Sequence, residues 1–185
     1  ERADHRLFAD VASIAEALRV AAGHLPPLPE LAPRPCHGDL KLSNVLFRGP
    51  EAHCLIDLDT LAPMHLGYEV GDALRSWCNP HREDEAGRAS FELPFFSAAW
   101  TGYARGRAQP IPEAERRAVL YGVEHVCLEL TARFLGDALL ERYFGFDPQR
   151  YPGRGEHNLA RARGQWALFR AVQACREARA RVLDL

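Results

Sequence analysis

The sequence contains almost no lysine and almost no methionine. Lys41 is the only lysine and Met64 the only methionine among 185 residues, so arginine supplies nearly all of the positive charge. A reaction that needs a lysine from this chain must therefore use Lys41. The preference for arginine is typical of a GC-rich bacterial genome, and we attach no function to it.

Cysteine is also scarce and scattered. The chain has five cysteines, an odd number, and no two of them form a CxxC pair: Cys36, Cys54, Cys78, Cys127 and Cys175. A disulfide framework or a structural zinc site would need tighter grouping. In the pairs Cys36-His37 and His53-Cys54 the side chains would point to opposite faces of a strand, which disfavours a shared metal ion. We expect free thiols in a reducing cytoplasm.

Strong net charge and long apolar runs are absent as well. The formal net charge is -2 at pH 7, which provides neither a basic field for nucleic acid nor an acidic tail. No apolar run approaches the roughly 18 residues that a membrane-spanning helix needs. The first residues, Glu1 to Asp4, lack the apolar stretch of a signal peptide. We therefore expect a cytoplasmic globular protein with no nucleic-acid or membrane partner.

The residues that are present indicate a mostly helical α+β protein. Apolar residues at helical spacing predict an amphipathic helix over residues 1 to 22, and the prolines between positions 26 and 35 predict an extended connector after it. Two short apolar runs, 45 to 47 and 54 to 56, flank a turn-rich stretch and predict a β-hairpin. Further helices are predicted over residues 68 to 77, 91 to 103, 112 to about 140 (one helix, or two with a break near Gly136) and about 158 to 182, capped by His157 and Asn158.

Polar side chains lie at the outer ends of the predicted hairpin. Asp39 and Asn44 precede its first strand, and Asp57 and Asp59 follow its second. Each residue alone is typical of a turn or a helix cap. Pairing of the two strands, however, brings the start and the exit of the hairpin together. A carboxylate that accepts a hydroxyl proton, with a second carboxylate and an amide that hold magnesium on phosphates, are the groups that ATP-dependent phosphoryl transfer requires.

The same segment carries a family resemblance. HGDLKLSN, from His37 to Asn44, and LIDLD, from Leu55 to Asp59, are similar to the HGDxxxxN and IDxD pattern of the aminoglycoside phosphotransferase and choline kinase family. Within it the chain resembles in particular the N-acetylhexosamine kinase group, at IDLDT (56 to 60), GDALR (71 to 75), RFL (133 to 135) and HNL (157 to 159). The resemblance runs from Pro35 onward and implies the C-terminal lobe of a protein-kinase-like fold.

The resemblance also implies roles for the residues of the loop. Asp39 would be the catalytic base, and Lys41 would neutralise charge on the phosphoryl group in transfer. Asn44 and Asp57 would bind Mg²⁺ and, through it, the phosphates of ATP. Asp59 would add a further contact to the cofactor.

Other residues would support the loop or contact the substrate. The resemblance implies that His37 maintains the geometry of the loop and that Asp72 braces it through hydrogen bonds to its backbone. Arg75 and Arg133 are possible substrate contacts, and for Arg133 a surface ion pair is an equal alternative.

A kinase-like fold also has a small lobe with a glycine-rich loop over the phosphates and a lysine that pairs with them. The sequence has neither GxGxxG nor GxxxxGK[ST], and Lys41 already lies in the catalytic loop. We therefore expect the N-terminal nucleotide-binding lobe to be missing, and the chain alone to bind nucleotide weakly and to be nearly inactive. The lobe would divide into a leading helix and connector (1 to 35), the catalytic loop and metal-binding hairpin (36 to 60) and a helical substrate-binding subdomain (61 to 185).

Several functions are compatible with these residues. The leading hypothesis is a kinase for a small-molecule hydroxyl, on a sugar or amino sugar. An aminoglycoside or choline-type kinase, a pseudokinase-like binding module and a metal-dependent hydrolase are the alternatives. A polycationic aminoglycoside would favour a strongly acidic pocket, for which the candidates are Glu83, Asp84, Glu85, Glu124 and Glu129.

Overall fold

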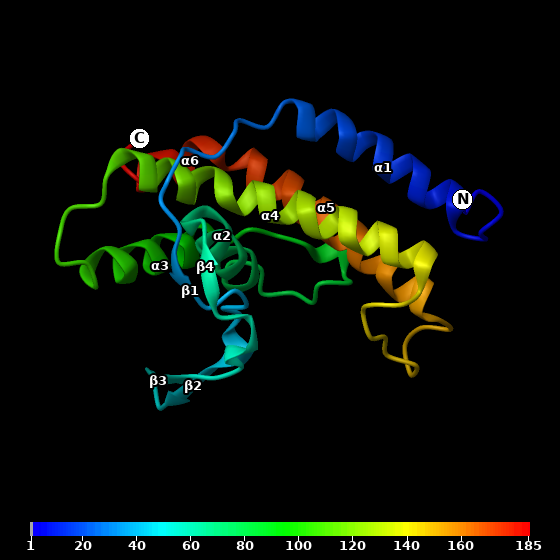
Figure 1. Cartoon of the computed structure of the whole chain (residues 1–185), viewed down its shortest axis with the longest axis horizontal. Coiled ribbons are helices and arrows are strands. Elements are labelled where there is room, and N and C mark those ends of the chain that lie inside the picture. The colour runs from blue at the N-terminus through cyan, green and yellow to red at the C-terminus, as the bar shows by residue number, and fades with distance from the viewer. Residues whose placement is uncertain (1) are drawn as a thin grey trace.

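The computed structural model describes residues 2 to 185, in which a small strand-containing segment extends from a helical body (Figure 1). The helices are α1 (Phe8–Gly23), α2 (Leu66–Trp77), α3 (Leu93–Arg105), α4 (Glu113–Leu140), α5 (Arg154–Ala174) and α6 (Arg176–Val182), and the strands are β1 (Arg34–Cys36), β2 (Val45–Arg48), β3 (Glu51–Leu55) and β4 (Ala62–Met64). The mostly helical α+β class is thus confirmed. No helix of residues 2 to 185 is long and apolar enough to cross a membrane.

The helical body is built on α4 and α5, which run antiparallel beside each other (Figure 1). The predicted helix at 112 to 140 is one unbroken helix. The predicted last helix, in contrast, is two helices that meet at Cys175. Arg179 fixes α6 in place, because its buried guanidinium donates to Leu120 O at 2.5 Å and to Glu124 Oε1 at 2.6 Å. The predicted first helix begins at Phe8, and its first predicted residue, Glu1, lies outside the described residues.

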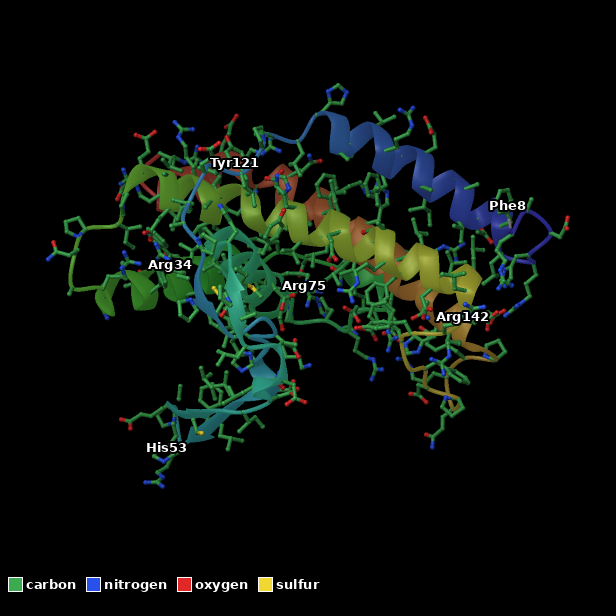
Figure 2. All side chains as sticks on the ribbon, in the orientation of Figure 1. Phe8, Arg34, His53, Arg75, Tyr121 and Arg142 are labelled. Carbon is green, nitrogen blue, oxygen red and sulfur yellow. The ribbon has the colours of Figure 1, made fainter. Side chains whose placement is uncertain are left out.

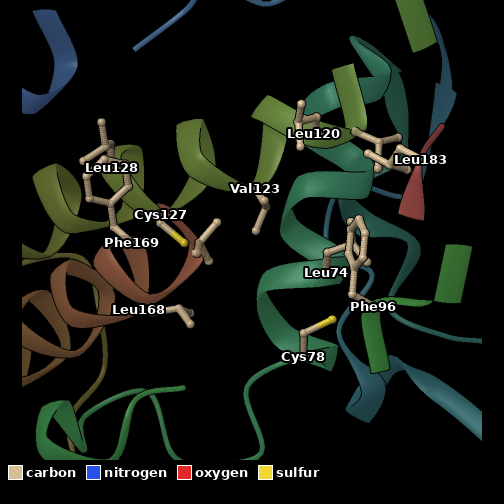
Figure 3. Packing of buried hydrophobic residues seen from close by; sticks show 12 residues of the cluster. Leu74, Cys78, Phe96, Leu120, Val123, Cys127, Leu128, Leu168, Phe169 and Leu183 are labelled. Atoms are coloured by element: carbon tan, nitrogen blue, oxygen red, sulfur yellow. The ribbon is translucent and has the colours of Figure 1, made fainter. Parts of the chain in front are cut away.

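Two apolar cores stabilise the body. The larger lies where α2, α3, α4 and the C-terminal helices meet, and includes Leu74, Phe96, Val123 and Phe169 (Figure 3). The smaller joins α1 to α4 and α5 around Phe134. Burial of these side chains contributes about 1.5 to 3 kcal/mol each.

Helices α2 and α4 approach each other at their backbones. A Cβ added to Gly122 of α4 would lie 2.0 Å from Gly67 O of α2, and one added to Gly71 would lie 2.5 Å from Gly122 C. Only glycine fits at such a crossing. Helix α2 is therefore held tightly against α4, and its polar residues have fixed positions beside the catalytic loop.

The predicted hairpin is confirmed, with β2 and β3 antiparallel in the register Val45 to Leu55 and Leu46 to Cys54. All five residues of β3 are exposed, and Figure 2 shows His53 at the outer end of the hairpin, away from the helices. The sequence did not predict a second antiparallel pair, β1 with β4, in which Arg34 lies opposite Met64. This pair closes the two ends of the segment predicted to be catalytic, His37 to Thr60, because β1 precedes the loop and β4 follows the hairpin.

Candidate active site

Asn44 joins the two carboxylates that the sequence predicted to converge. Its side chain is buried at the end of the short 3-10 helix Leu42–Asn44. Asn44 Nδ2 donates to Asp39 O at 2.9 Å and to Asp39 Oδ2 at 3.0 Å, and it lies 3.4 Å from Asp57 Oδ2. The predicted convergence of Asp39, Asn44 and Asp57 is thus confirmed.

Lys41 lies against the same carboxylate. Its Nζ is 2.5 Å from Asp39 Oδ2, and both side chains remain partly exposed. Asp39 therefore has one ammonium and one amide as hydrogen-bond donors. Such donors fix the orientation of a carboxylate.

His37 and Gly38 determine the shape of the loop before Asp39. His37 is buried, its Nε2 donates to Ile56 O at 2.9 Å, and its Nδ1 accepts from Asp39 N at 3.3 Å. Gly38 has φ of +83°, and a Cβ there would lie 2.7 Å from Thr60 O. Thr60 Oγ1 in turn donates to His37 O at 2.7 Å. These hydrogen bonds connect the loop to the chain that follows β3. This is the structural role that the sequence predicted for His37.

Glu69 of α2 braces the backbone of the loop, a role that the sequence analysis assigned to Asp72. Its two carboxylate oxygens accept from His37 N at 2.9 Å and from Gly38 N at 2.8 Å. Asp72 instead accepts from Arg75, at 3.0 Å from Nε and 2.8 Å from Nη2. The assignment was therefore wrong by one helical turn. Residues i and i+3 lie on the same face of a helix, so the sequence contained Glu69 as an equal candidate.

Helix α2 holds the loop at a second point. Trp77 Nε1 donates to Leu40 O at 2.8 Å. Because Glu69 and Trp77 lie more than two turns apart on one rigid helix, the loop is fixed on both sides of Asp39. The hydrogen bonds of Glu69 and Trp77 thus hold the backbone around Asp39 in place, and the carboxylate of Asp39 takes no part in them.

Asp57 adopts an unusual backbone conformation. Its φ and ψ are 63° and 59°, in the left-handed region that few residues other than glycine enter. Strained backbone of this kind is concentrated at functional sites. Asp59, two residues further on, is exposed on the 3-10 helix Leu58–Thr60, and no hydrogen bond or ion pair within residues 2 to 185 connects it to Asp39, Asn44 or Asp57.

A cavity of about 750 Å³ opens beside Asp39. Such a volume is within the range of small-molecule sites. Its wall combines the catalytic loop (Gly38, Asp39, Lys41) with α2 (Tyr68, Glu69, Asp72, Arg75), Glu83, α4 (Val126, Glu129, Leu130, Arg133, Phe134), the loop after α4 (Tyr143, Phe144, Gly145) and Arg161 of α5. The carboxylate of Asp39 and the helical body thus share one cavity.

Arg75 and Arg133 both line this cavity, in different settings. Arg75 lies between the catalytic segment and the loop after α4 in the view of Figure 2. Burial opposes its charge, but Asp72 and Glu83 beside it raise the pKa of the guanidinium. Arg133 is half exposed, 3.5 Å from Glu129, and its guanidinium covers the rings of Tyr143 and Phe144.

The five acidic residues that could have formed an acidic pocket do not converge. Glu83 and Glu129 line the cavity. Glu124 is fully buried between Arg176 and Arg179, and Glu85 pairs with Arg88 at 3.5 Å. Among the side chains of the cavity, carboxylates and cations are of nearly equal number.

Asp84 and His157 form a separate polar cluster. Asp84 accepts from Arg150 at 2.5 Å, from Tyr151 Oη at 3.0 Å and from His157 Nε2 at 3.1 Å. Burial opposes its charge, yet the hydrogen bonds from Arg150 and Tyr151 lower the pKa of Asp84 to about 2. His157 is therefore a buried contact between α5 and the loop before α3, and not the predicted helix cap. Asn158 is likewise no cap, since its Nδ2 donates to Asp137 Oδ2 at 2.8 Å.

The oxygen ligands at this end of the hairpin fit magnesium better than a softer metal. Asp57 and Asn44 offer one carboxylate and one amide oxygen, and Mg²⁺ is usually held by one or two such groups with phosphates and water. Among residues 2 to 185, no three His, Cys, Asp or Glu side chains form a metal cage. A metal ion here would therefore depend on phosphate oxygens for the rest of its coordination.

A family comparison agrees with this chemistry. Residues 1–108 match the model of the phosphotransferase enzyme family (APH). The match covers more than half of the chain and includes the catalytic loop, the hairpin and α2, so the chain belongs to this family. Enzymes of the family transfer phosphoryl groups to small molecules, and they generally use ATP and a divalent metal ion. The match ends before α4 and α5, which form the other side of the cavity.

Proposed function

We propose that this chain is the catalytic and substrate-binding lobe of a kinase that transfers the γ-phosphate of ATP to a hydroxyl group of a sugar or amino sugar. The observation that carries the proposal is the position of Asn44, whose Nδ2 donates to Asp39 Oδ2 at 3.0 Å and lies 3.4 Å from Asp57 Oδ2, beside the 750 Å³ cavity. One carboxylate faces the cavity, and the other lies at the hairpin exit with oxygen ligands for a metal ion.

Asp39 is the residue that receives the proton of the attacking hydroxyl. Its Oδ2 is held by Lys41 and Asn44, so it cannot rotate away from a hydroxyl that enters the cavity. When the proton arrives on Asp39, Lys41 is free to turn toward the phosphoryl group and offset its charge. Asp57 and Asn44 would hold Mg²⁺, which neutralises negative charge on the phosphates when it is bound.

The charge of the cavity favours a neutral or singly charged sugar over a polycationic aminoglycoside. Five carboxylates and four Lys or Arg side chains line the cavity, and Asp72 and Glu129 are paired with Arg75 and Arg133, so the cavity has too little net negative charge for several ammonium groups. Tyr143 is largely exposed beside Arg133, and its ring provides an apolar face of the kind that sugars pack against. An N-acetylhexosamine fits this mixture of aromatic surface and hydrogen-bonding groups.

The exposed surface around the hairpin supports a second part of the proposal, which concerns nucleotide binding. Large apolar side chains are exposed around the hairpin: Leu42, Leu46, Phe47, Leu55, Ile56, Leu58 and Leu61. So many exposed apolar side chains within residues 42 to 61 are typical of a surface that binds a partner or ligand. We propose that the adenine base and a separate nucleotide-binding lobe cover it, and that the chain without such a lobe has little activity.

A substrate screen tests the proposal. The chain joined to its nucleotide-binding lobe is incubated with Mg-ATP and with hexoses, N-acetylhexosamines, aminoglycosides or choline, and ADP release is followed. We expect turnover with a hexose or N-acetylhexosamine. Asp39→Asn should reduce kcat by about 100- to 10,000-fold, since general-base catalysis contributes that much, while ATP binding is retained.

Asp10→Asn is the matched control, because Asp10 is an exposed aspartate in the first turn of α1 that pairs with Arg163 and does not line the cavity. It should leave kcat unchanged. The proposal is wrong if Asp39→Asn turns over as fast as the parent protein, or if a phosphorylated product forms without nucleotide.

A further inference from the structure

Glu83 is one of five carboxylates that line the cavity, and it is far more rigidly held than its place in a loop suggests. It lies between α2 and α3, and its backbone is pressed against α5, where a Cβ added to Gly164 would be 1.9 Å from Glu83 O. The next residue, Asp84, is fixed by Arg150, Tyr151 and His157. The loop cannot shift here without breaking these contacts.

The polar neighbours of Glu83 are all at long distances. Arg75 Nη1 is 3.4 Å away, Gln165 Nε2 is 3.2 Å away and Arg161 Nε is 3.6 Å away. Charge-assisted hydrogen bonds are normally about 2.7 to 2.9 Å. Arg75 forms its close bonds with Asp72 instead, at 2.8 and 3.0 Å. Among residues 2 to 185, Glu83 thus has two cations and one amide near it but no hydrogen bond shorter than 3.2 Å.

The carboxylate of Glu83 also remains accessible from the cavity. It is a lining residue, and 36% of its side chain is exposed. A carboxylate has about four acceptor positions, so Glu83 retains capacity for further donors. Burial raises the pKa of Glu83, with Arg75 and Arg161 opposing the shift. A rigid carboxylate in an unfavourable setting is typical of a functional group more than of a stabilising one.

We propose that Glu83 is a specificity-determining residue, which accepts hydrogen bonds from sugar hydroxyl groups other than the one that reacts at Asp39. The identity of the ligand as a sugar rests on the proposed function. Both carboxylates line the cavity, and within residues 2 to 185 Glu83 and Asp39 have different hydrogen-bond partners, which is the arrangement expected if they contact different parts of the substrate. Glu83 positions the sugar, and Asp39 takes the proton.

A purely structural role for Glu83 makes a different prediction. If its purpose were to neutralise Arg75 and Arg161, removing its charge would lower the melting temperature. The long distances predict the opposite, because Asp72 already compensates Arg75 and the charged form of Glu83 is disfavoured by burial. Glu83→Gln should therefore melt at the same temperature as the parent chain or higher.

The experiment measures sugar binding by the 185-residue chain, for which no nucleotide is required. Glucose, galactose, N-acetylglucosamine and N-acetylgalactosamine are titrated calorimetrically into the parent chain and into Glu83→Gln, Glu85→Gln and Asp39→Asn. We expect at least one sugar to bind, and Glu83→Gln to weaken its binding about 10- to 100-fold, in the range for loss of a hydrogen bond to a charged group. Glu85→Gln is the matched control, because Glu85 is on the same loop but does not line the cavity.

Deoxy analogues of the bound sugar provide the sharper readout. The analogue that lacks the contacted hydroxyl should bind weakly to the parent chain and lose no further affinity in Glu83→Gln. Equal affinity of Glu83→Gln and the parent chain for all four sugars, absence of binding by the parent chain, or a lower melting temperature of Glu83→Gln would each overturn the inference. Glu83-dependent binding of a sugar that the lobe-joined protein does not phosphorylate would overturn the kinase function and leave this inference standing.

Discussion

The catalytic segment and the helical body of this protein are built in opposite ways. The segment from His37 to Thr60 contains a hairpin whose second strand is exposed along its whole length, and its only buried side chains are His37 and Asn44. The body around α4 and α5 contains both apolar cores. The segment is held by a small number of polar contacts, and the body by extensive apolar packing.

This difference separates the sources of activity and stability. Three side chains fix the loop through hydrogen bonds to its backbone: Glu69, Trp77 and Thr60. Each of these bonds contributes only about 0.5 to 3 kcal/mol. Such contacts orient Asp39 with little effect on the folded state as a whole. Substitutions in the segment should therefore affect turnover first, and those in the body stability first.

The largest effect on stability is expected at the crossing of α2 and α4. Gly122→Ala would place a methyl group 2.0 Å from Gly67 O, so the helices must separate. We expect a loss of at least about 3 kcal/mol, at or above the usual range for overpacking, measured by urea denaturation. Gly102→Ala is the control, since Gly102 is exposed on α3 with nothing within 4 Å of an added Cβ. It should stabilise the chain by about 0.5 to 1 kcal/mol; equal effects of the two changes would contradict this account.

The next largest effect should separate activity from stability. Glu69→Gln keeps the shape of the side chain but places an NH₂ group against one of the two N–H donors of His37 and Gly38. We expect kcat to fall about 10- to 100-fold, because a hydrogen bond involving a charged group contributes about 1.5 to 3 kcal/mol, with a smaller loss of unfolding free energy. Glu113→Gln, on an exposed part of α4, should change neither. If Glu69→Gln unfolded the chain as readily as Gly122→Ala, the segment and the body would not be separable.

The smallest effect concerns the pH dependence of the body. Burial lowers the pKa of His157 below its ordinary value of 6.5, so the unfolded chain binds this proton more readily than the folded chain. The unfolding free energy should therefore fall as the pH drops below about 6.5, with a further loss between pH 3.8 and 2 as Asp84 is protonated. Denaturation of His157→Gln across pH 5 to 7.5 should show a weaker dependence over the first window. His24→Gln, at an exposed histidine, should keep the dependence of the parent chain.

Much of the fold could be predicted because it depends on local patterns. The hairpin and the helices α2, α3 and α4 follow from apolar periodicity and turn residues, which are properties of neighbouring residues. The features that the sequence did not predict depend on contacts between residues far apart in the chain. The pairing of β1 with β4 joins residues that are far apart in the sequence, and the break at Cys175 arises because Arg179 must reach Glu124 and Leu120 of α4.

The sequence by itself determined the convergence of the polar side chains of the loop and predicted their chemistry, since Asp39, Lys41, Asn44 and Asp57 are recognisable from their order and spacing within about twenty residues. Only the tertiary structure decided which further carboxylates contact the loop or line the cavity beside it. Glu69, and not Asp72, reaches its backbone, because the close approach of α2 to α4 sets the rotation of α2. Glu83 lies in the cavity because Gly164 of α5 accepts its backbone. Spacing along the chain determines which side chains of one short segment can act together. The packing of helices far apart in the sequence determines which side chains of different segments meet.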